Sequence, residues 1–169
     1  MTEKENNNYT REKYHFWMEK FKTYIPIGST LCDIGVAGTS QFNYKACFKD
    51  FRYRTLDKDA SLNSNVILDL ENLPKDCYEY YNFLLCNGVT EWCNNPFNLV
   101  EGCYNLLKKD GYALFGIILY GYPLLYSEDK TRFTVKGVYN LLKKFTIVEE
   151  EILYFNNLPS YHYLIVKKL

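Results

Sequence analysis

Four polar side chains lie at the ends of apolar segments, a common location for ligand-binding residues in α/β proteins. They are Asp33 in LCD, Asp57 in RTLD, Asp69 in VILD and Asn87 in FLLCN. Short apolar runs bounded by turn residues are typical of buried parallel strands. Because parallel strands end at the same edge of their sheet, these side chains are expected to gather at one ligand-binding edge.

The segment LCDIGVAGTS, residues 31–40, carries the strongest signal. An apolar strand ends in Asp33 and enters a turn through Gly35, Ala37 and Gly38 before a helix begins. Small residues let a ligand approach the backbone closely, and the N-terminus of the following helix lies at the same edge. An ordinary tight connection between strand and helix has the same pattern, so this turn alone is weak evidence.

Asp57 and Asp69 suit the parts of a nucleoside. Asp57 lies about twenty residues after Gly35, where a carboxylate can accept hydrogen bonds from both ribose hydroxyls. Asp69 is followed by Leu70, and this pair offers a polar partner for the exocyclic amine of adenine beside an apolar wall. A solvated turn residue is the alternative interpretation of Asp57.

Together these segments resemble the class I S-adenosylmethionine-dependent methyltransferases, in particular the methyltransferase type 11 group. The resemblance covers about residues 30 to 145 and rests on DIGVAGTS, TLDKD, VILDLENLP, FLLCNGVTEW and LLKKDGYALFGI, in chain order. The segment YPLLYSEDKTRFTVKGVYNLL also resembles the loop and helix that follow the fifth strand in this group. The resemblance implies a Rossmann-like fold, S-adenosylmethionine as the cofactor and methyl transfer as the activity.

The resemblance also implies roles for individual residues. The methionine part of the cofactor would lie against the first turn, the ribose against Asp57, and the adenine against Asp69 and Leu70. Asn87 and Gly88 would flank the reactive sulfur. The complete set of implied cofactor-binding residues is Asp33, Gly35, Ala37, Gly38, Asp57, Asp69, Leu70, Asn87 and Gly88.

Candidate residues for the methyl acceptor come from the two ends of the chain. The N-terminal helix often folds over the cofactor in the methyltransferases that the chain resembles, so His15 is the candidate general base, with a structural histidine as the alternative. Tyr122, Tyr126 and Arg132 lie in the loop expected to overhang the acceptor, although such loop residues are often simply solvated. Neither His15 nor His162 has metal-ligand spacing with a cysteine or carboxylate, so no metal is expected.

The elements that position these residues follow from the hydrophobic pattern. Helical spacing and capping residues predict helices over residues 9–24, 40–48, 96–107 and 135–143. Apolar runs predict strands over residues 30–35, 53–56, 66–68, 81–86, 112–119, 146–154 and 162–167. The connection between the last two strands is short enough to require antiparallel pairing. The sequence therefore predicts an α/β, Rossmann-like three-layer sandwich with a mostly parallel seven-stranded sheet and a C-terminal antiparallel hairpin.

The composition limits the domain organisation and the classes of partner that the chain could bind. The chain has 169 residues, of which 20 are basic and 20 acidic. We expect a flexible polar segment over residues 1–8 and a single S-adenosylmethionine-binding domain over residues 9–169. Because the charges balance and form no long basic block, nucleic-acid binding is not expected. No apolar stretch is long enough to insert into a membrane. The six cysteines form no CxxC pair, so free thiols and a cytoplasmic location are expected.

Three functions remain open from the sequence. Methyl transfer from S-adenosylmethionine to a small-molecule acceptor is the first. A catalytically degenerate subunit that binds this cofactor or another nucleoside and regulates a partner is the second. An NAD-binding domain is the third, but its G-x-G-x-x-G pattern is absent, and Asp33 would repel a pyrophosphate while attracting a sulfonium. The acceptor and the oligomeric state are left open.

Overall fold

The computed structural model describes the backbone of residues 3–35, 44–122 and 129–169, and the side chains of these ranges from residue 8 onward. The strands are β1 (Thr30–Ile34), β2 (Arg52–Asp57), β3 (Val66–Ile67), β4 (Tyr81–Asn87), β5 (Leu107–Ile118), β6 (Thr146–Phe155) and β7 (Leu158–Lys167). They form one sheet in the order β3-β2-β1-β4-β5-β7-β6. All pairs from β3 to β5 are parallel, and β7 pairs antiparallel with both β5 and β6. The predicted sheet and its C-terminal hairpin are confirmed.

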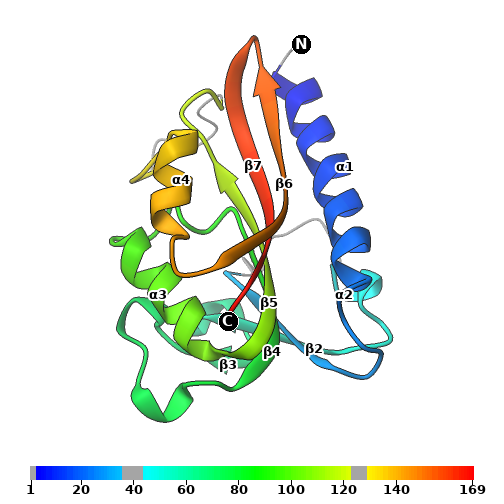
Figure 1. Ribbon diagram of the computed structural model, residues 1–169, viewed down its shortest axis with the longest axis vertical. Helices are drawn as coiled ribbons and strands as arrows, with labels where there is room; N and C mark the ends of the chain where they lie inside the picture. The colour runs from blue at the N-terminus through cyan, green and yellow to red at the C-terminus, as the bar shows by residue number, and fades with distance from the viewer. Residues whose placement is uncertain (1–2, 36–43, 123–128) are drawn as a thin grey trace.

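Helices cover both faces of this sheet (Figure 1). The helices are α1 (Glu3–Lys22), α2 (Tyr44–Cys47), α3 (Pro96–Leu106) and α4 (Val135–Leu141), and the 3₁₀ turns are η1 (Ala60–Leu62), η2 (Leu70–Asn72) and η3 (Lys75–Cys77). α1 lies on one face, whereas α3 and α4 lie on the other. No helix in the described ranges is long and apolar enough to cross a membrane.

Two hydrophobic cores, one on each face of the sheet, hold the layers together. In β4, Phe83 and Leu85 belong to the core beneath α1, whereas Leu84 and Cys86 belong to the core beneath α3 and α4. This alternation is the pattern of a strand buried on both faces. All six cysteines carry free thiols, as the sequence predicted.

The apolar stripe of α1 packs on the sheet. Tyr14, Trp17 and Phe21 recur at helical spacing and are each at most 2% exposed. The helix begins at Glu3, six residues before the start that the sequence predicted. This buried stripe holds the middle of the helix against the sheet. The polar residues that precede the stripe belong to the same helix.

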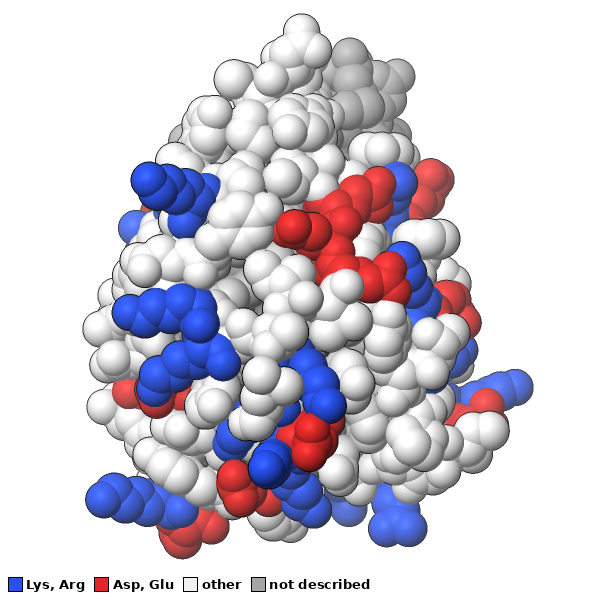
Figure 2. All heavy atoms as spheres, viewed as in Figure 1, with Lys and Arg blue, Asp and Glu red and all other residues white. Residues whose placement is uncertain are grey.

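Ion pairs join α1 to β6 beside this stripe. Lys13 Nζ lies 2.6 Å from Glu151 Oε1, and Lys20 pairs with Glu149. Trp17 Nε1 also donates a hydrogen bond of 2.9 Å to Glu151. Figure 2 shows acidic side chains gathered over this part of the surface with basic side chains next to them. Because part-exposed ion pairs contribute only about 0–1 kcal/mol each, the apolar stripe determines how α1 docks.

Two strands begin earlier than the sequence predicted. β5 begins at Leu107, which pairs with Tyr81, and pairing resumes at Tyr112 after a bulge over residues 108–111. Asp110 has a φ of 61° within this bulge, so the Asp-Gly dipeptide bends a strand that continues on both sides.

β7 begins at Leu158 because the hairpin turn is only two residues long. Asn156 and Asn157 have φ values of 48° and 65°, and Phe155 pairs directly with Leu158. Two left-handed residues are typical of a type I′ turn, whose twist matches the strands that it joins. Pro159, expected in the loop, therefore lies within β7.

Candidate functional site

A cavity of about 420 Å³ opens where β1, β2, β3 and β4 end. It lies on the α3 side of the sheet, since Leu56, Cys93 and Leu99 belong to the core on that side. Its lining residues are Ile34, Gly35, Leu56, Asp57, Lys58, Leu68, Asp69, Leu70, Glu71, Gly88, Val89, Trp92, Cys93 and Leu99. The predicted ligand-binding edge is therefore a hollow of mostly apolar walls with a few polar groups, as small-molecule sites commonly are.

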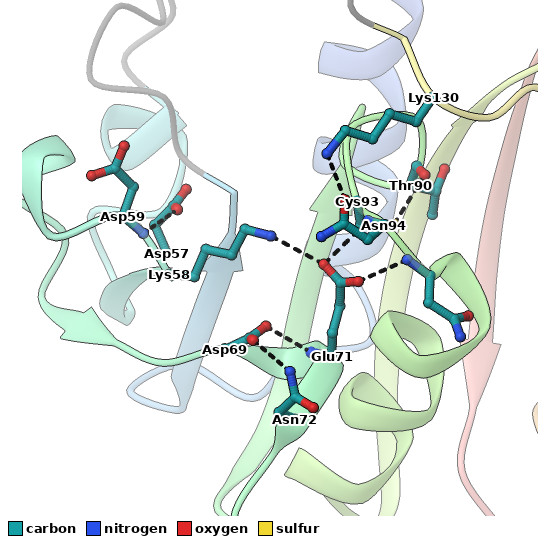
Figure 3. Close-up of polar contacts among 11 residues, drawn as sticks. Asp57, Lys58, Asp59, Asp69, Glu71, Asn72, Thr90, Cys93, Asn94 and Lys130 are labelled. Carbon is teal, nitrogen blue, oxygen red and sulfur yellow. Dashed lines mark hydrogen bonds and ion pairs between the residues drawn. The ribbon is translucent and has the colours of Figure 1, made fainter.

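Asp57 and Asp69 both line the cavity, as the sequence predicted. Asp57 Oδ1 accepts the backbone N–H of Asp59 at 2.9 Å. Asp69 caps η2, where Oδ1 accepts the N–H of Glu71 at 3.0 Å and Oδ2 accepts the amide of Asn72 at 2.8 Å (Figure 3). Each carboxylate is thus oriented by its own turn, and each oxygen keeps a lone pair for a ligand.

Glu71 is a cavity residue that the sequence interpretation missed. It accepts hydrogen bonds from Lys58 Nζ at 3.1 Å and from the backbone N–H groups of Asn95 and Asn94 at 2.7 and 3.3 Å (Figure 3). Burial acts to raise the pKa of Glu71, but the N–H of Asn95 and the ammonium of Lys58 outweigh it and hold that pKa below its ordinary value. The ionised carboxylate therefore ties together the segments after β2, β3 and β4. An acidic residue two positions after Asp69 was the available signal.

Two glycines form the part of the cavity nearest the sheet. Gly35 and Gly88 have φ values of 72° and 65°, which side chains other than glycine rarely adopt. A Cβ on Gly35 would lie 2.6 Å from Cγ2 of Val89, so the Val89 side chain packs directly against this glycine. These positions keep the backbone accessible to a ligand. Ala37 and Gly38, also predicted to bind it, lie outside the described residues.

Asp33 and Asn87 do not line this cavity. Asp33 is buried on the α1 side of β1, where Tyr53 donates a hydrogen bond to its carboxyl group. Burial raises the pKa of Asp33 to about 7, and the bond from Tyr53 opposes this shift. Asn87 Oδ1 accepts the hydroxyl of Tyr161 at 2.8 Å. The first residue is therefore separated from the cavity by its strand, and the second is held by β7.

The two histidines lie away from the cavity. His15 is exposed on α1, with Nε2 3.7 Å from Sγ of Cys47, and borders a separate surface hollow. The structure therefore does not bring the candidate base to the candidate cofactor site. His162 is fully buried in β7, with Nε2 2.7 Å from Glu150 Oε2, and burial lowers its pKa. It is a core residue.

Tyr122 and Arg132, two of the residues predicted to bind the acceptor, lie beside Tyr161 and do not line the cavity. Tyr122 is buried and packs edge-on against Tyr161, with ring centroids 6.0 Å apart. Arg132 forms an ion pair with Asp129, and its guanidinium lies 5.8 Å from the ring of Tyr122. Tyr126 lies outside the described residues.

Glu91 is a second residue that the sequence interpretation missed. It is 1% exposed, and its backbone carbonyl accepts the N–H of Lys130 at 2.7 Å. Burial and Asp129 raise the pKa of Glu91 to about 7, and Arg132 opposes the shift. We call Asn87, Glu91, Asp129, Arg132 and Tyr161 the Glu91 cluster. A glutamate inside VTEWC, between apolar neighbours, was the only signal.

Known structures share this architecture. No protein-family model and no curated protein sequence matches the chain. A 1,6-didemethyltoxoflavin-N1-methyltransferase from Burkholderia thailandensis, solved with S-adenosylhomocysteine, superposes with a TM-score of 0.67 at 15% identity, over 98% of this chain and 82% of that one. A SAM-dependent methyltransferase from Archaeoglobus fulgidus gives a TM-score of 0.69 at 14% identity, over 94% of both chains. The [4+2]-cyclase SpnF gives 0.67 at 11% identity, over 92% of this chain and 80% of that one.

These likenesses settle the fold. The chain has the fold of the class I S-adenosylmethionine-dependent methyltransferases, with the sheet order and the terminal hairpin described above. Because the same fold is found in a cyclase, the reaction must be argued from the site.

Proposed function

We propose that this chain binds S-adenosylmethionine in the cavity at the carboxyl edge of its sheet and transfers the methyl group to a small-molecule acceptor. One observation carries the proposal. Asp57 and the pair Asp69–Leu70 line a single cavity beside the left-handed glycines Gly35 and Gly88. A nucleoside needs a partner for its diol, a partner for its exocyclic amine beside an apolar wall, and open backbone, and these residues would supply all three.

The residues of the cavity suit this cofactor. Its volume of about 420 Å³ falls within the range typical of small-molecule sites. Asp57 would hold the ribose, and Leu70, Leu99 and Asp69 would hold the adenine. The amino acid part would lie against the exposed backbone of Gly35 and Gly88, which both line the cavity. When bound, S-adenosylmethionine supplies a methyl group on a positively charged sulfur.

The protein contributes mainly position to such a reaction. Methyl transfer by in-line displacement needs the acceptor atom and the methyl carbon held about 3–3.5 Å apart and aligned, and this alignment alone can account for much of the rate. Gly88 carries no side chain between the cavity and the Glu91 cluster. The acceptor would meet the methyl group beside Gly88.

The test is isothermal titration calorimetry of the purified protein with S-adenosylhomocysteine, beside NADH. We expect saturable, micromolar binding of S-adenosylhomocysteine alone. Binding of NADH alone would favour the dehydrogenase-like alternative, and binding of neither would contradict the proposal. Binding of S-adenosylhomocysteine in a stable complex with another protein, without methyl transfer to any acceptor, would favour the regulatory subunit instead.

A further inference from the structure

A buried carboxyl group lies beside Gly88, which lines the proposed cofactor cavity. A Cβ built on Gly88, which lines the cavity, would lie 3.2 Å from Glu91 Oε1 and 3.7 Å from the hydroxyl of Tyr161. That hydroxyl is itself held by Asn87. Because position 88 is glycine, no side chain at this position separates the cavity from the Glu91 carboxyl group.

The charges around Glu91 leave it free to exchange a proton. Two buried carboxyl groups, Glu91 and Asp129, share one guanidinium, and Arg132 forms its ion pair with Asp129. Nε and Nη1 of Arg132 are buried and donate to no acceptor in the described part of the chain. The other titratable groups that face Glu91 are Tyr161, Cys86 and Cys93. Because none of these supplies a second positive charge, Glu91 can be neutral or ionised near neutral pH.

We propose that the methyl acceptor carries a hydroxyl group, and that the Glu91 carboxylate accepts its proton during transfer. This inference rests on the proposed function. The acceptor oxygen forms a bond to the methyl carbon while the carbon–sulfur bond breaks, and that electron pair neutralises the sulfonium. The hydroxyl proton passes to Glu91, which later releases it to water. Glu91 thus takes the role that the sequence gave to His15.

The first experiment follows the titration of Glu91 by ¹³C NMR in protein carrying [δ-¹³C]glutamate, with its signal assigned by its loss in Glu91→Gln. A sulfonium nearby favours the carboxylate, so the midpoint should lie about one pH unit or more lower with S-adenosylmethionine than with S-adenosylhomocysteine, which lacks the positive charge. Glu71, which is already held by Lys58 and the N–H of Asn95, is the control and should shift far less.

The outcomes of this experiment separate the two proposals. Equal Glu91 midpoints in the two complexes would place the carboxyl group away from the sulfur and overturn the inference. Failure of both compounds to bind would overturn the proposed function itself.

The second experiment tests the class of acceptor with phenol and anisole as probes, added to the protein saturated with S-adenosylhomocysteine. Anisole keeps the ring but has no O–H to donate. At pH 8 phenol should bind at least about fivefold more tightly than anisole, and Glu91→Gln should reduce this preference whereas Asp76→Asn, on the exposed surface, should not. Equal binding of the two probes to the wild type, or an unchanged preference in Glu91→Gln, would overturn the hydroxyl assignment.

A second, independent observation concerns the surface between α1 and α2. Among the described residues, donor atoms of His15, Glu19 and Cys47 lie within 4.8 Å of one another, and His15 Nε2 is 3.7 Å from Cys47 Sγ. His15 and Glu19 are one helical turn apart on α1, while Cys47 comes from α2. Tetrahedral zinc with nitrogen, oxygen and sulfur ligands needs its donors about 3.5 Å apart, so only small side-chain movements are required.

We infer that His15, Glu19 and Cys47 bind a zinc ion, with water as the fourth ligand. Cys47 loses its thiol proton to solvent on binding. The test titrates the metal-free full-length protein with Zn²⁺ alone by calorimetry, and with Co²⁺ alone while following the thiolate-to-cobalt absorption band. We expect one equivalent of Zn²⁺ and an absorption band that Cys47→Ser abolishes. Cys77→Ser, at another part-exposed cysteine, should retain both.

Two results would overturn this site. One is the absence of micromolar Zn²⁺ binding by the wild type. The other is Zn²⁺ affinity that changes less than about tenfold in both His15→Ala and Cys47→Ser, because first ligands of a zinc site contribute more than that.

Discussion

Asp57 and Asp69 both line the cavity, but their carboxylates differ in how many local bonds they already accept. Asp69 accepts one bond on each oxygen, whereas Asp57 accepts only the N–H of Asp59. Asp57 is therefore better able to bind a diol, which presents two hydroxyl donors to one carboxylate. Its contribution to affinity can be isolated by mutation.

Replacing Asp57 with alanine should weaken binding of S-adenosylhomocysteine by about 1–3 kcal/mol, the value of a charge-assisted hydrogen bond. That corresponds to an increase in Kd of about 5- to 150-fold. Isothermal titration calorimetry measures the change, with Asp76→Asn as a control on the exposed surface. An unaltered Kd would remove Asp57 from the site.

Asp33 should make stability depend on pH. Its folded-state pKa of about 7 lies above the ordinary value of 3.8, so the folded state retains a proton that the unfolded state has lost between these values. The free energy of unfolding therefore falls as pH rises from about 4 to 7 and levels off above 7.

Asp33→Asn removes this dependence while keeping an acceptor for Tyr53. Its stability advantage over the wild type should grow by up to about 1.4 kcal/mol per pH unit between pH 4 and 7, then stay constant. Urea unfolding at each pH measures the difference. Glu91 titrates in the same range in both proteins, so its effect cancels. A difference that does not vary with pH would show that Asp33 stays ionised.

At the scale of elements, the apolar wall of the cavity at Leu70 depends on how closely α3 approaches η2. A Cβ on Gly102 of α3 would lie 2.1 Å from the carbonyl oxygen of Leu70, which is backbone and cannot rotate away. A Cβ on Gly137 of α4 would meet only side-chain atoms, the nearest at 3.3 Å. The two helices thus offer a matched pair of glycines.

Alanine at a helical glycine normally stabilises a helix by up to about 1 kcal/mol. Gly137→Ala should follow this rule or be neutral. Gly102→Ala should instead lower the free energy of unfolding by about 1–3 kcal/mol and weaken S-adenosylhomocysteine binding, because η2 must move away. Chemical unfolding and calorimetry test both variants. Equal stability of the two variants would mean that η2 can move away from α3 with little loss of free energy.

The strands were predictable because each buried strand is a short apolar run. The edge at which the cavity lies was predictable because parallel strands all end at the same edge of the sheet. Asp57 and Asp69 followed directly, since each lies just after a strand. Asp33 did not, because the cavity lies on one face of β1 and the alternation of that strand turns Asp33 to the other. Glu71 and Glu91 were missed because a glutamate in a turn is usually solvated, and only tertiary contacts bury these two.

At the scale of the molecule, the sheet separates two tasks. The core beneath α3 and α4 contains the apolar wall of the cavity, including Leu56, Leu70 and Leu99. The core beneath α1 contains large aromatic side chains such as Trp17 and Phe21, and none of the residues that line this cavity belongs to it. The residues on the α3 and α4 side can therefore move when a ligand binds, while the core beneath α1 keeps the sheet in place.

This division predicts which regions a ligand protects. S-adenosylhomocysteine at about 100 times its Kd should raise the free energy of unfolding by about 2.7 kcal/mol. Hydrogen exchange should slow most at Gly35, at residues 57–59 and 69–71, and at residues 88–93. Amides of α1 that open only by global unfolding should gain no more than the global increase. Extra protection confined to the turns of α1 around His15 would mean that this helix folds over the ligand, and would restore His15 as a candidate base in place of Glu91.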